Sequence, residues 1–388
     1  MKALRIALVA GEQSGDQLGA GLIRELRERA PQARFMGIAG PRMIAEGCEC
    51  WERSENLAVM GLFEVLSHLP SLHRLRASTL RRLLEEQPDV FVGIDAPEFN
   101  LGLARRLRAA GLRTVQYVSP QVWAWRPGRV RTIARSVDLV LCLLPFEQEF
   151  YAHAGVRAEF VGHPLADQIP LTPDQAEARA QLGLDRRPVI AVLPGSRLGE
   201  VARLGDAFAA TIARLAGQRP ELQFVAPMAS APVRARFEQA LARRAPGIAV
   251  RLVDGQAQLA LAAADVVLVA SGTATLETML SKRAMVVAYR LSALTSWLVR
   301  GLNLMKAPHF AQPNLLAGRV VVPEFFQEQV TPAALGDALL AFLDDSATRE
   351  ALARLFTDQH LKLRRNASAR ASEAVLGLVT RPQPAAAP

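Results

Sequence analysis

Short apolar runs recur along the first half of the chain, and stretches with helical periodicity separate them. The runs lie at residues 4–10, 34–38, 90–95, 114–118, 139–143 and 159–161. Helical patterns such as 19–29 and 101–110 lie between them. Runs that are apolar throughout are typical of parallel strands buried on both faces. Their alternation with helices predicts a doubly wound parallel sheet.

The same alternation starts again at Pro188, with apolar runs at 189–193, 223–226, 249–253, 266–270 and 285–288. A chain of 388 residues is long for a single core, so we predict an α/β protein with two Rossmann-like domains. The expected borders are 1–165 for the first domain, 166–187 for a proline-rich linker, 188–345 for the second domain, 346–380 for C-terminal helices and 381–388 for a disordered Pro/Ala-rich tail.

The net charge of +9 comes almost entirely from arginine and suits an anionic partner, such as phosphate or an acidic membrane surface. A nucleic-acid partner is not expected, because the arginines are scattered over helices and not clustered with aromatic residues. The three cysteines lack metal-ligand spacing to histidines, so no zinc site is expected. The first apolar run is interrupted by Arg5 and ends in Gly11-Glu12, which favours a first strand over a signal peptide and predicts a cytoplasmic protein.

Residues 60–76 depart from this rhythm, because large apolar residues stand beside arginines and histidines where only a connection is needed. One interpretation is an amphipathic core helix with a solvated face. The other is a surface helix that lies in the membrane interface and makes the protein a peripheral membrane protein. Residues 294–306 have a similar composition and include Trp297.

A hydroxyl-rich turn follows the apolar run 264–270 and leads into a helix. Its sequence is Ser271-Gly272-Thr273-Ala274-Thr275-Leu276-Glu277. Helix N-termini at the carboxyl ends of parallel strands favour phosphate, and Glu277 can accept hydrogen bonds from both hydroxyls of a ribose. The plain alternative is a strand–turn–helix with Ser or Thr as its N-cap.

Pro194-Gly195-Ser196-Arg197 closes the first strand of the second half, which is the equivalent place at the same predicted sheet edge. Gly195 permits close approach, Ser196 can donate, and the guanidinium of Arg197 can pair with phosphate oxygens. A simple turn with a solvated arginine is the alternative. Together the two junctions predict a pocket for a nucleoside diphosphate.

In the first half, Gly11-Glu12-Gln13-Ser14-Gly15-Asp16 joins the first strand to a helix, without the spacing of a dinucleotide fingerprint. Asp95 ends another buried strand, so it is either a general base for an acceptor hydroxyl or an N-cap. Trp123 and Trp125 follow the next strand and offer a surface for a sugar or an acyl chain. His163 is interpreted as a structural residue of the linker.

With these residues, the chain resembles the lipid-A-disaccharide synthase family over about nine-tenths of its length. The colinear motifs are Ala10-Gly11-Glu12, Gly40-Pro41-Arg42-Met43, Gly93–Asn100, Val118–Arg129, Phe160–Leu165, Leu193–Arg197, Ser271–Glu277 and Pro313–Ala317. Gln13 and Gln121 depart from the usual family residues, and we interpret both as tolerated variation.

The resemblance implies a GT-B fold with a cleft between its domains, no cofactor and no metal. It also implies that the C-terminal helices at 346–380 cross back onto the first domain. It implies that UDP-2,3-diacylglucosamine and 2,3-diacylglucosamine 1-phosphate react, with inversion, to give a β-1,6-linked disaccharide 1-phosphate and UDP. Asp95 would be the catalytic base. The residues expected to bind substrate are Gly11, Glu12, Ser14, Gly15, Asp16, Asn100, Trp123, Trp125 and Asn314. The residues expected to bind the nucleotide are Gly195, Ser196, Arg197, Leu252, Val253, Ser271, Gly272, Thr273, Ala274, Thr275 and Glu277.

Two functions from other classes stay open at this point. A UDP-sugar 2-epimerase would share the fold and the nucleotide pocket, but would need acidic and histidine residues on both cleft walls. A non-enzymatic, membrane-associated nucleotide-binding module would leave Asp95 unexplained. A homo-oligomer is compatible with the sequence.

Overall fold

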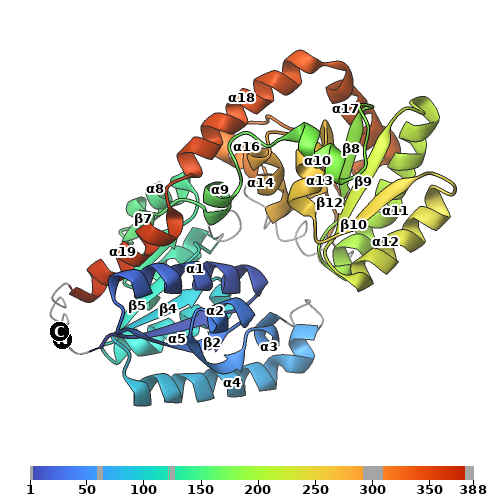
Figure 1. Cartoon of the computed structure of the whole chain (residues 1–388). Coiled ribbons are helices and arrows are strands. Elements are labelled where there is room, and N and C mark those ends of the chain that lie inside the picture. Colours follow the sequence, from blue (N-terminus) through green and yellow to red (C-terminus); the bar gives the residue numbers. More distant parts are fainter. Residues whose placement is uncertain (1–2, 59–63, 121, 123–126, 292–308, 381–388) are drawn as a thin grey trace. The chain divides into compact units, whose positions relative to one another are not determined.

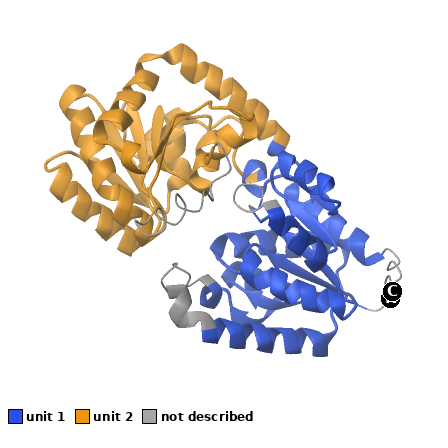
Figure 2. Cartoon of the chain, turned by 180° about the vertical axis from the view of Figure 1, so that it is seen from behind, with its two compact units in different colours: residues 1–167, 363–388 blue, residues 168–362 orange. Residues whose placement is uncertain are grey.

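The computed structural model describes residues 3–58, 64–120, 122, 127–291 and 309–380 (Figure 1). The chain forms two compact units (Figure 2). Unit 1 comprises residues 1–167 and 363–388, and unit 2 comprises residues 168–362. The helix that begins at Ser346 belongs to unit 2 as far as Lys362. None of the described helices is long and apolar enough to cross a membrane.

Unit 1 contains a parallel sheet of seven strands in the order β3-β2-β1-β4-β5-β6-β7 (Figure 1). The strands are β1 (Arg5–Ala10), β2 (Arg34–Ala39), β3 (Cys48–Arg53), β4 (Val90–Ile94), β5 (Arg113–Tyr117), β6 (Leu139–Cys142) and β7 (Ala158–Phe160). The helices are α1 (Gln13–Arg29), α2 (Pro41–Ala45), α3 (Glu55–Ala58), α4 (Glu64–Glu86), α5 (Pro97–Ala109), η1 (Pro127–Arg129), α7 (Val130–Ser136), α8 (Pro145–His153), α9 (Pro164–Gln168) and α19 (Ala367–Thr380).

The central strands of unit 1 are buried on both faces, which explains their continuous apolar runs. Helices α1 and α19 cover one face, where Leu22 and Val375 join the same core cluster. Helices α4, α5, α7 and α8 cover the other face, with Leu83, Phe99 and Ile133 in a second cluster. Helix α19, the last described helix, therefore completes the core of unit 1.

Unit 2 contains six parallel strands in the order β10-β9-β8-β11-β12-β13. The strands are β8 (Val189–Leu193), β9 (Gln223–Met228), β10 (Val250–Asp254), β11 (Val266–Ala270), β12 (Ala284–Tyr289) and β13 (Glu324–Phe326). The helices are α10 (Gln175–Gln181), α11 (Leu198–Gln218), α12 (Ala231–Arg244), α13 (Ala257–Ala263), α14 (Thr273–Leu280), α16 (Gln312–Ala317), η2 (Gln327–Gln329), α17 (Pro332–Asp344) and α18 (Ser346–Leu363). The predicted α/β class with two doubly wound parallel sheets is confirmed.

Each sheet has one point where the strand order reverses, and ligands of open α/β sheets bind at such points. In unit 1 this point lies between β1 and β4, where Ala10 pairs with Ile94. In unit 2 it lies between β8 and β11, where Leu193 pairs with Val269. The register therefore brings the turn after β1 beside Asp95, and the turn after β8 beside Ser271.

Two strands, β3 and β13, have no counterpart among the predicted ones. Both lie at sheet edges, and most of their residues are only partly buried. Strand β3, of sequence CECWER, mixes apolar and charged residues, and β13 has only three residues. An apolar-run criterion detects central strands and misses edges of this kind.

Candidate functional site

The turn after β1 packs directly on the turn after β4. A Cβ atom at Gly11 would collide with the Cβ of Ala96, so only glycine allows this approach. Gly15 is also buried, and a Cβ there would lie 3.6 Å from the carbonyl oxygen of Ile94. Glu12 is half-buried at the N-cap of α1, and Ser14 is exposed. Glu12, Gln13 and Ser14 are therefore the members of this motif with polar side chains at or near the surface.

Asp95 stands in a strained turn. Its φ of 52° is followed by a φ of 40° at Ala96, and Val118, which follows the neighbouring strand β5, has a φ of 77°. Left-handed backbone is uncommon outside glycine and is a marked outlier for a β-branched residue. Such strain persists only where surrounding contacts enforce it, and it concentrates at functional sites. The half-buried Asp95 therefore has the backbone expected of a residue placed for a function.

Asn100 and Asp16 were predicted to bind substrate, and the structure places both side chains in the interior. Asn100 is fully buried, and its Nδ2 donates to the carbonyl oxygens of Asp95 and Val9 at 2.9 and 3.2 Å. Asp16 is 2% exposed, and its carboxylate accepts from the backbone N–H groups of Arg42 and Met43, both at 2.9 Å. Both side chains therefore hold neighbouring turns, and a direct contact of either residue with substrate stays a prediction.

Asn314 was also predicted to bind substrate, and its side chain likewise makes internal hydrogen bonds, so the substrate contact stays a prediction. Its side chain is fully buried at the start of α16. Its Nδ2 donates to the carbonyl oxygen of Val322 at 2.9 Å, and its Oδ1 accepts from the N–H groups of Val321 and Val322 at 2.7 and 2.9 Å. The amide therefore fixes the segment that leads into β13.

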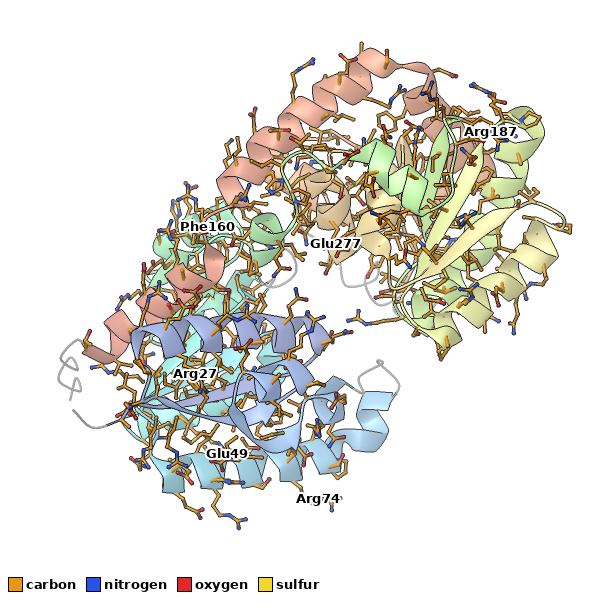
Figure 3. The ribbon with its side chains drawn as sticks, viewed as in Figure 1. Arg27, Glu49, Arg74, Phe160, Arg187 and Glu277 are labelled. Atoms are coloured by element: carbon orange, nitrogen blue, oxygen red, sulfur yellow. The ribbon has the colours of Figure 1, made fainter. Side chains whose placement is uncertain are left out.

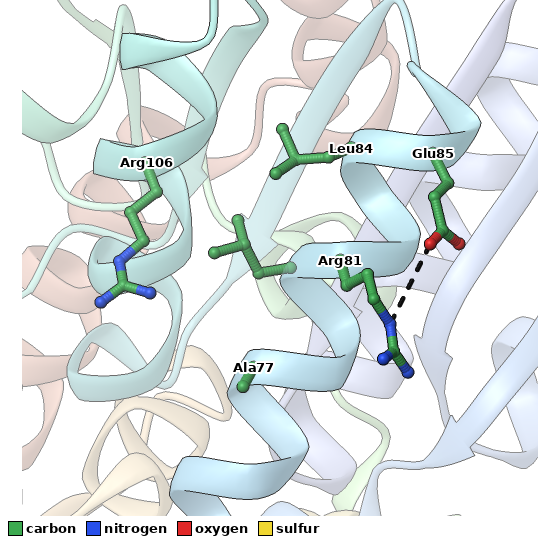
Figure 4. A pocket seen from close by; sticks show the side chains of 6 residues that line it. Ala77, Arg81, Leu84, Glu85 and Arg106 are labelled. Atoms are coloured by element: carbon green, nitrogen blue, oxygen red, sulfur yellow. Dashed lines mark ion pairs between the residues drawn. The ribbon is translucent and has the colours of Figure 1, made fainter.

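Trp123, Trp125 and residues 294–306 lie outside the described residues, as do residues 60–63 of the predicted membrane segment. The later part of that segment lies in α4, where Leu72 and Leu75 pack against the core of unit 1. The core-helix interpretation therefore holds for these two leucines. A shallow groove between α4 and α5, seen in Figure 4 with the Arg81–Glu85 ion pair of 4.0 Å, contains none of the predicted site residues.

In unit 2, the turn after β8 already holds a carboxylate of its own. Oε2 of Glu200 accepts from the N–H groups of Ser196 and Arg197 at 2.9 and 3.3 Å. The exposed guanidinium of Arg197 lies 3.7 Å from Oε1 of the same side chain. Gly195 lies beside Glu200 and is half-buried. The N–H groups predicted to meet a phosphate thus face an anion supplied by α11.

The turn after β11 combines an internal hydroxyl with exposed positions. Thr275 is fully buried and donates to the carbonyl oxygen of Gly272 at 2.8 Å, so its hydroxyl stabilises the start of α14. A contact of Thr275 with the nucleotide stays a prediction. Gly272 and Thr273 are exposed, while Ser271 and Ala274 are partly exposed. These four positions present the N-terminus of α14 to solvent.

Glu277 lies one turn into α14 and is labelled in Figure 3. Its side chain is half-buried, and burial raises the pKa of its carboxyl group. Among the described residues, its carboxylate makes no hydrogen bond or ion pair. A desolvated carboxylate without a partner is a candidate for ligand binding. Leu252 and Val253, predicted to lie near the base, are half-buried on the edge strand β10.

His163 behaves as a structural residue, as its sequence context suggested. Its backbone N–H donates to the carbonyl oxygen of Leu363 at 2.9 Å, and its Nδ1 accepts from the N–H of Leu165 at 3.2 Å. Burial lowers the pKa of its imidazole to about 4. His163 is therefore neutral near pH 7 and joins two distant parts of unit 1.

Sequence reasoning missed Gln116, which is 1% exposed in β5 and contacts the Asp95 turn. Its Nε2 lies 3.0 Å from the carbonyl oxygen of Asp95. One signal was present, because a glutamine inside a strand buried on both faces breaks an apolar run. Such a break indicates a polar group with a specific partner.

Comparison with known proteins agrees with this arrangement. A family model described as lipid-A-disaccharide synthetase matches residues 6–375. The lipid-A-disaccharide synthase of Alkalilimnicola ehrlichii is 54% identical over 96% of this chain and 98% of its own. That of Pseudomonas aeruginosa strain UCBPP-PA14 is 53% identical over 97% of this chain and 99% of its own.

Solved structures with low sequence identity share the fold. The calicheamicin glycosyltransferase CalG4 has a TM-score of 0.59 at 18% identity, covering 98% of this chain and 99% of its own. A UDP-GlcNAc 2-epimerase from Neisseria meningitidis has a TM-score of 0.65 at 12% identity, covering 96% of this chain and 100% of its own. At these identities the likeness concerns the fold alone, so the epimerase function gains no support from it. The near full-length sequence matches show that this chain belongs to the lipid-A-disaccharide synthase family.

Proposed function

We propose that this glycosyltransferase moves 2,3-diacylglucosamine from its UDP derivative to the 6-hydroxyl of 2,3-diacylglucosamine 1-phosphate. The observation that carries the proposal is the pair of strand-order reversals in a chain of this family. A strained carboxylate, Asp95, follows β4 at one of them. A carboxylate without a partner among the described residues, Glu277, follows β11 at the other. One edge is suited to an acceptor and the other to a nucleotide.

The proposed reaction is a single displacement with inversion. The acceptor oxygen forms a bond to C1 of the donor sugar while the bond from C1 to the UDP oxygen breaks. Asp95 takes the hydroxyl proton, and UDP leaves as an anion. Half-buried Glu12 and exposed Ser14 lie in the turn beside Asp95, and this placement supports a role for them in holding the acceptor.

At the second edge, Glu277 accepts from the ribose hydroxyls, and the N-terminus of α14 at Gly272–Ala274 faces the diphosphate. Arg197 stabilises the negative charge on the leaving group. Glu200 then has to yield its hydrogen bonds or share them with a phosphate. Leu252 and Val253 offer main-chain groups to the uracil.

The direct test uses the purified chain, UDP-2,3-diacylglucosamine and 2,3-diacylglucosamine 1-phosphate. UDP release and a β-1,6-linked disaccharide 1-phosphate, detected by mass spectrometry, are the expected products. Release of UDP without a disaccharide, or conversion of the UDP-sugar into its C2 epimer, would contradict the proposal.

We also propose that residues 60–69 contact the cytoplasmic surface of the inner membrane, where acylated substrates reside. The apolar and basic composition of this stretch supports the proposal. Replacing Leu62, Phe63, Val65, Leu66 and Leu69 with Ser should release the protein from anionic vesicles, because each large side chain buried in the interface contributes roughly 1.5–3 kcal/mol. Co-sedimentation with vesicles measures the effect.

Leu72→Ser is the matched control, because Leu72 packs against the protein core. It should lower the melting temperature and leave vesicle binding intact. If the fivefold variant instead loses many degrees of melting temperature, its side chains belong to the core. If it stays folded and still sediments with vesicles, residues 294–306 become the next candidate for the contact.

A further inference from the structure

We propose that Gln116 is a positioning residue that joins the Asp95 turn to the start of the segment after β5. The inference rests on the proposed role of Asp95 as the base. No motif of the sequence pointed to Gln116. Its side-chain amide connects the ends of two neighbouring strands, and both of these ends have left-handed backbone.

The contacts of Gln116 converge on main-chain carbonyl groups. Its Nε2 lies 3.0 Å from the carbonyl oxygen of Asp95 and 3.3 Å from that of Val118. Asn100 approaches from α5, and its Nδ2 lies 2.9 Å from the same oxygen of Asp95. The Asp95 carbonyl thus accepts two buried amide donors, while its N–H donates to the carbonyl oxygen of Tyr117 at 2.8 Å. The main chain of Asp95 is fixed on both sides.

Gln116 contacts the two residues next to it in space that have strained backbone, Asp95 and Val118. Asp95 and Val118 both have positive φ, and Gln116 donates to the carbonyl oxygens of both. Without these donors, each residue would relax toward an ordinary negative φ, and a carboxylate on a relaxed turn would project differently. Gln116 therefore acts on catalysis through the conformation of Asp95, without touching substrate.

The amide oxygens of Gln116 and Asn100 make no hydrogen bond among the described residues, which indicates that the N–H groups of these amides are the ones that hold the Asp95 turn. Oε1 of Gln116 and Oδ1 of Asn100 are buried and have no hydrogen-bond partner among the described residues. The orientation is fixed, because a flipped amide would point its oxygen at carbonyl oxygens. An apolar side chain of similar size would avoid burying an unpaired oxygen. The benefit of these amides therefore lies in their N–H groups.

Gly93 makes the space for this arrangement. A Cβ atom at Gly93 would lie 2.7 Å from the Cβ of Asn100 and 3.2 Å from Oε1 of Gln116. A side chain on β4 at this position would displace both amides. Gly93, Asn100 and Gln116 thus form one support beneath the Asp95 turn.

The test compares Gln116→Met with Gln116→Glu in the full chain. Gln116→Met removes both donors, and kcat should fall by roughly 10- to 100-fold while UDP affinity stays unchanged, because small misplacements of a reacting group have effects of this size. The buried carboxyl group introduced by Gln116→Glu donates only when it is protonated, so the kcat of this variant relative to wild type should rise as pH falls. A general base shows the opposite trend, because its activity falls when it is protonated at low pH.

Gln359 provides the matched control. It is also buried, its Nε2 lies 3.5 Å from the carbonyl oxygen of Pro313, and its Oε1 has no partner among the described residues. Gln359→Met and Gln359→Glu should leave kcat and its pH profile unchanged. An equal loss of kcat in Gln359→Met, wild-type kcat in Gln116→Met, or a Gln116→Glu profile parallel to wild type would each overturn the inference.

Two further measurements cover the case in which Gln116→Met does not fold and separate the role of Gln116 from that of Asp95. If Gln116→Met does not fold, the pH profile of Gln116→Glu decides alone. In an Asp95→Asn background, Gln116→Met should cause little additional loss, because the residue acts through Asp95. High activity of Asp95→Asn would refute the base itself, whereas an inactive Asp95→Asn together with a fully active Gln116→Met would refute only the role of Gln116.

Discussion

Asp95→Asn should lower kcat by roughly 10²–10⁴-fold, the usual contribution of a general base, and leave UDP affinity near that of the wild type. Asparagine has nearly the same shape and cannot take the acceptor proton. It also tolerates left-handed backbone, so the φ of 52° at this position is preserved. Steady-state kinetics and calorimetry with UDP separate the loss of turnover from any loss of binding.

Asp89→Asn is the control at the opposite end of β4. Oδ2 of Asp89 accepts from the backbone N–H of Arg5 at 2.7 Å, and an asparagine oxygen can accept the same bond. The kcat of Asp89→Asn should therefore stay within a few-fold of the wild-type value, because the hydrogen bond from Arg5 is kept. Near-normal turnover in Asp95→Asn, with the protein folded, would remove Asp95 from the mechanism.

The fold was largely predictable because its central strands are buried on both faces. Strands β8 and β11 match the predicted ranges fully, and their residues are all buried. Pairing across the sheet then requires no further sequence information, since right-handed crossovers constrain a doubly wound order. Edge strands such as β3 were missed, because one side of an edge strand meets solvent and its sequence carries no continuous apolar run.

The sequence does not separate the polar residues that contact a ligand from those that hold a turn, and the reason is physical. The carboxyl ends of strands collect polar residues of two kinds, those that contact ligands and those that hold the turns, and their types are the same. Asp16 binds N–H groups 26 and 27 residues away, and Asn100 reaches a carbonyl 91 residues away. A short sequence motif does not reveal hydrogen-bond partners that are so far away in the sequence. Asp95 was chosen from the sequence because it directly follows a buried strand, and Glu277 because it lies one turn into the helix after another. Their roles in the site stay predictions.

Glu277→Ala should weaken UDP affinity by about ten- to a hundredfold, since hydrogen bonds to a charged group are worth roughly 1.5–3 kcal/mol. UDP and 2′-deoxy-UDP distinguish a ribose contact from a general loss of structure. Wild type should bind the deoxy compound more weakly than UDP, and Glu277→Ala should bind both alike. The exposed Glu350, changed to Gln, serves as control and should not alter either affinity. Equal discrimination by Glu277→Ala and wild type would place the ribose elsewhere.

The pH dependence of the same residue follows from its burial. Burial raises the pKa of Glu277 above its ordinary value of 4.5. In the proposed contact, the ribose hydroxyls would donate to the ionised carboxylate. As the pH is lowered, UDP affinity should therefore begin to fall at a higher pH than it would with a glutamate of ordinary pKa. UDP binding should release protons at pH values near and below that raised pKa. Calorimetry in two buffers of different ionisation enthalpy measures this release. Glu277→Gln should abolish it.

The ionised carboxylate of Glu277 should have opposite effects on UDP affinity and on the stability of the unliganded protein, because it favours UDP binding and disfavours folding. Well below the ordinary glutamate pKa of 4.5, the carboxyl group is protonated in both the folded and the unfolded state, so no charge is buried on folding. As the pH rises from there to the raised pKa of the folded state, the unfolded chain loses its proton more readily, and the folded state loses stability. Glu277→Gln should therefore raise the melting temperature of the unliganded protein at neutral pH and have no such effect well below the ordinary glutamate pKa. A melting temperature lowered at neutral pH would show that this carboxylate stabilises the fold and is not held in place for a ligand.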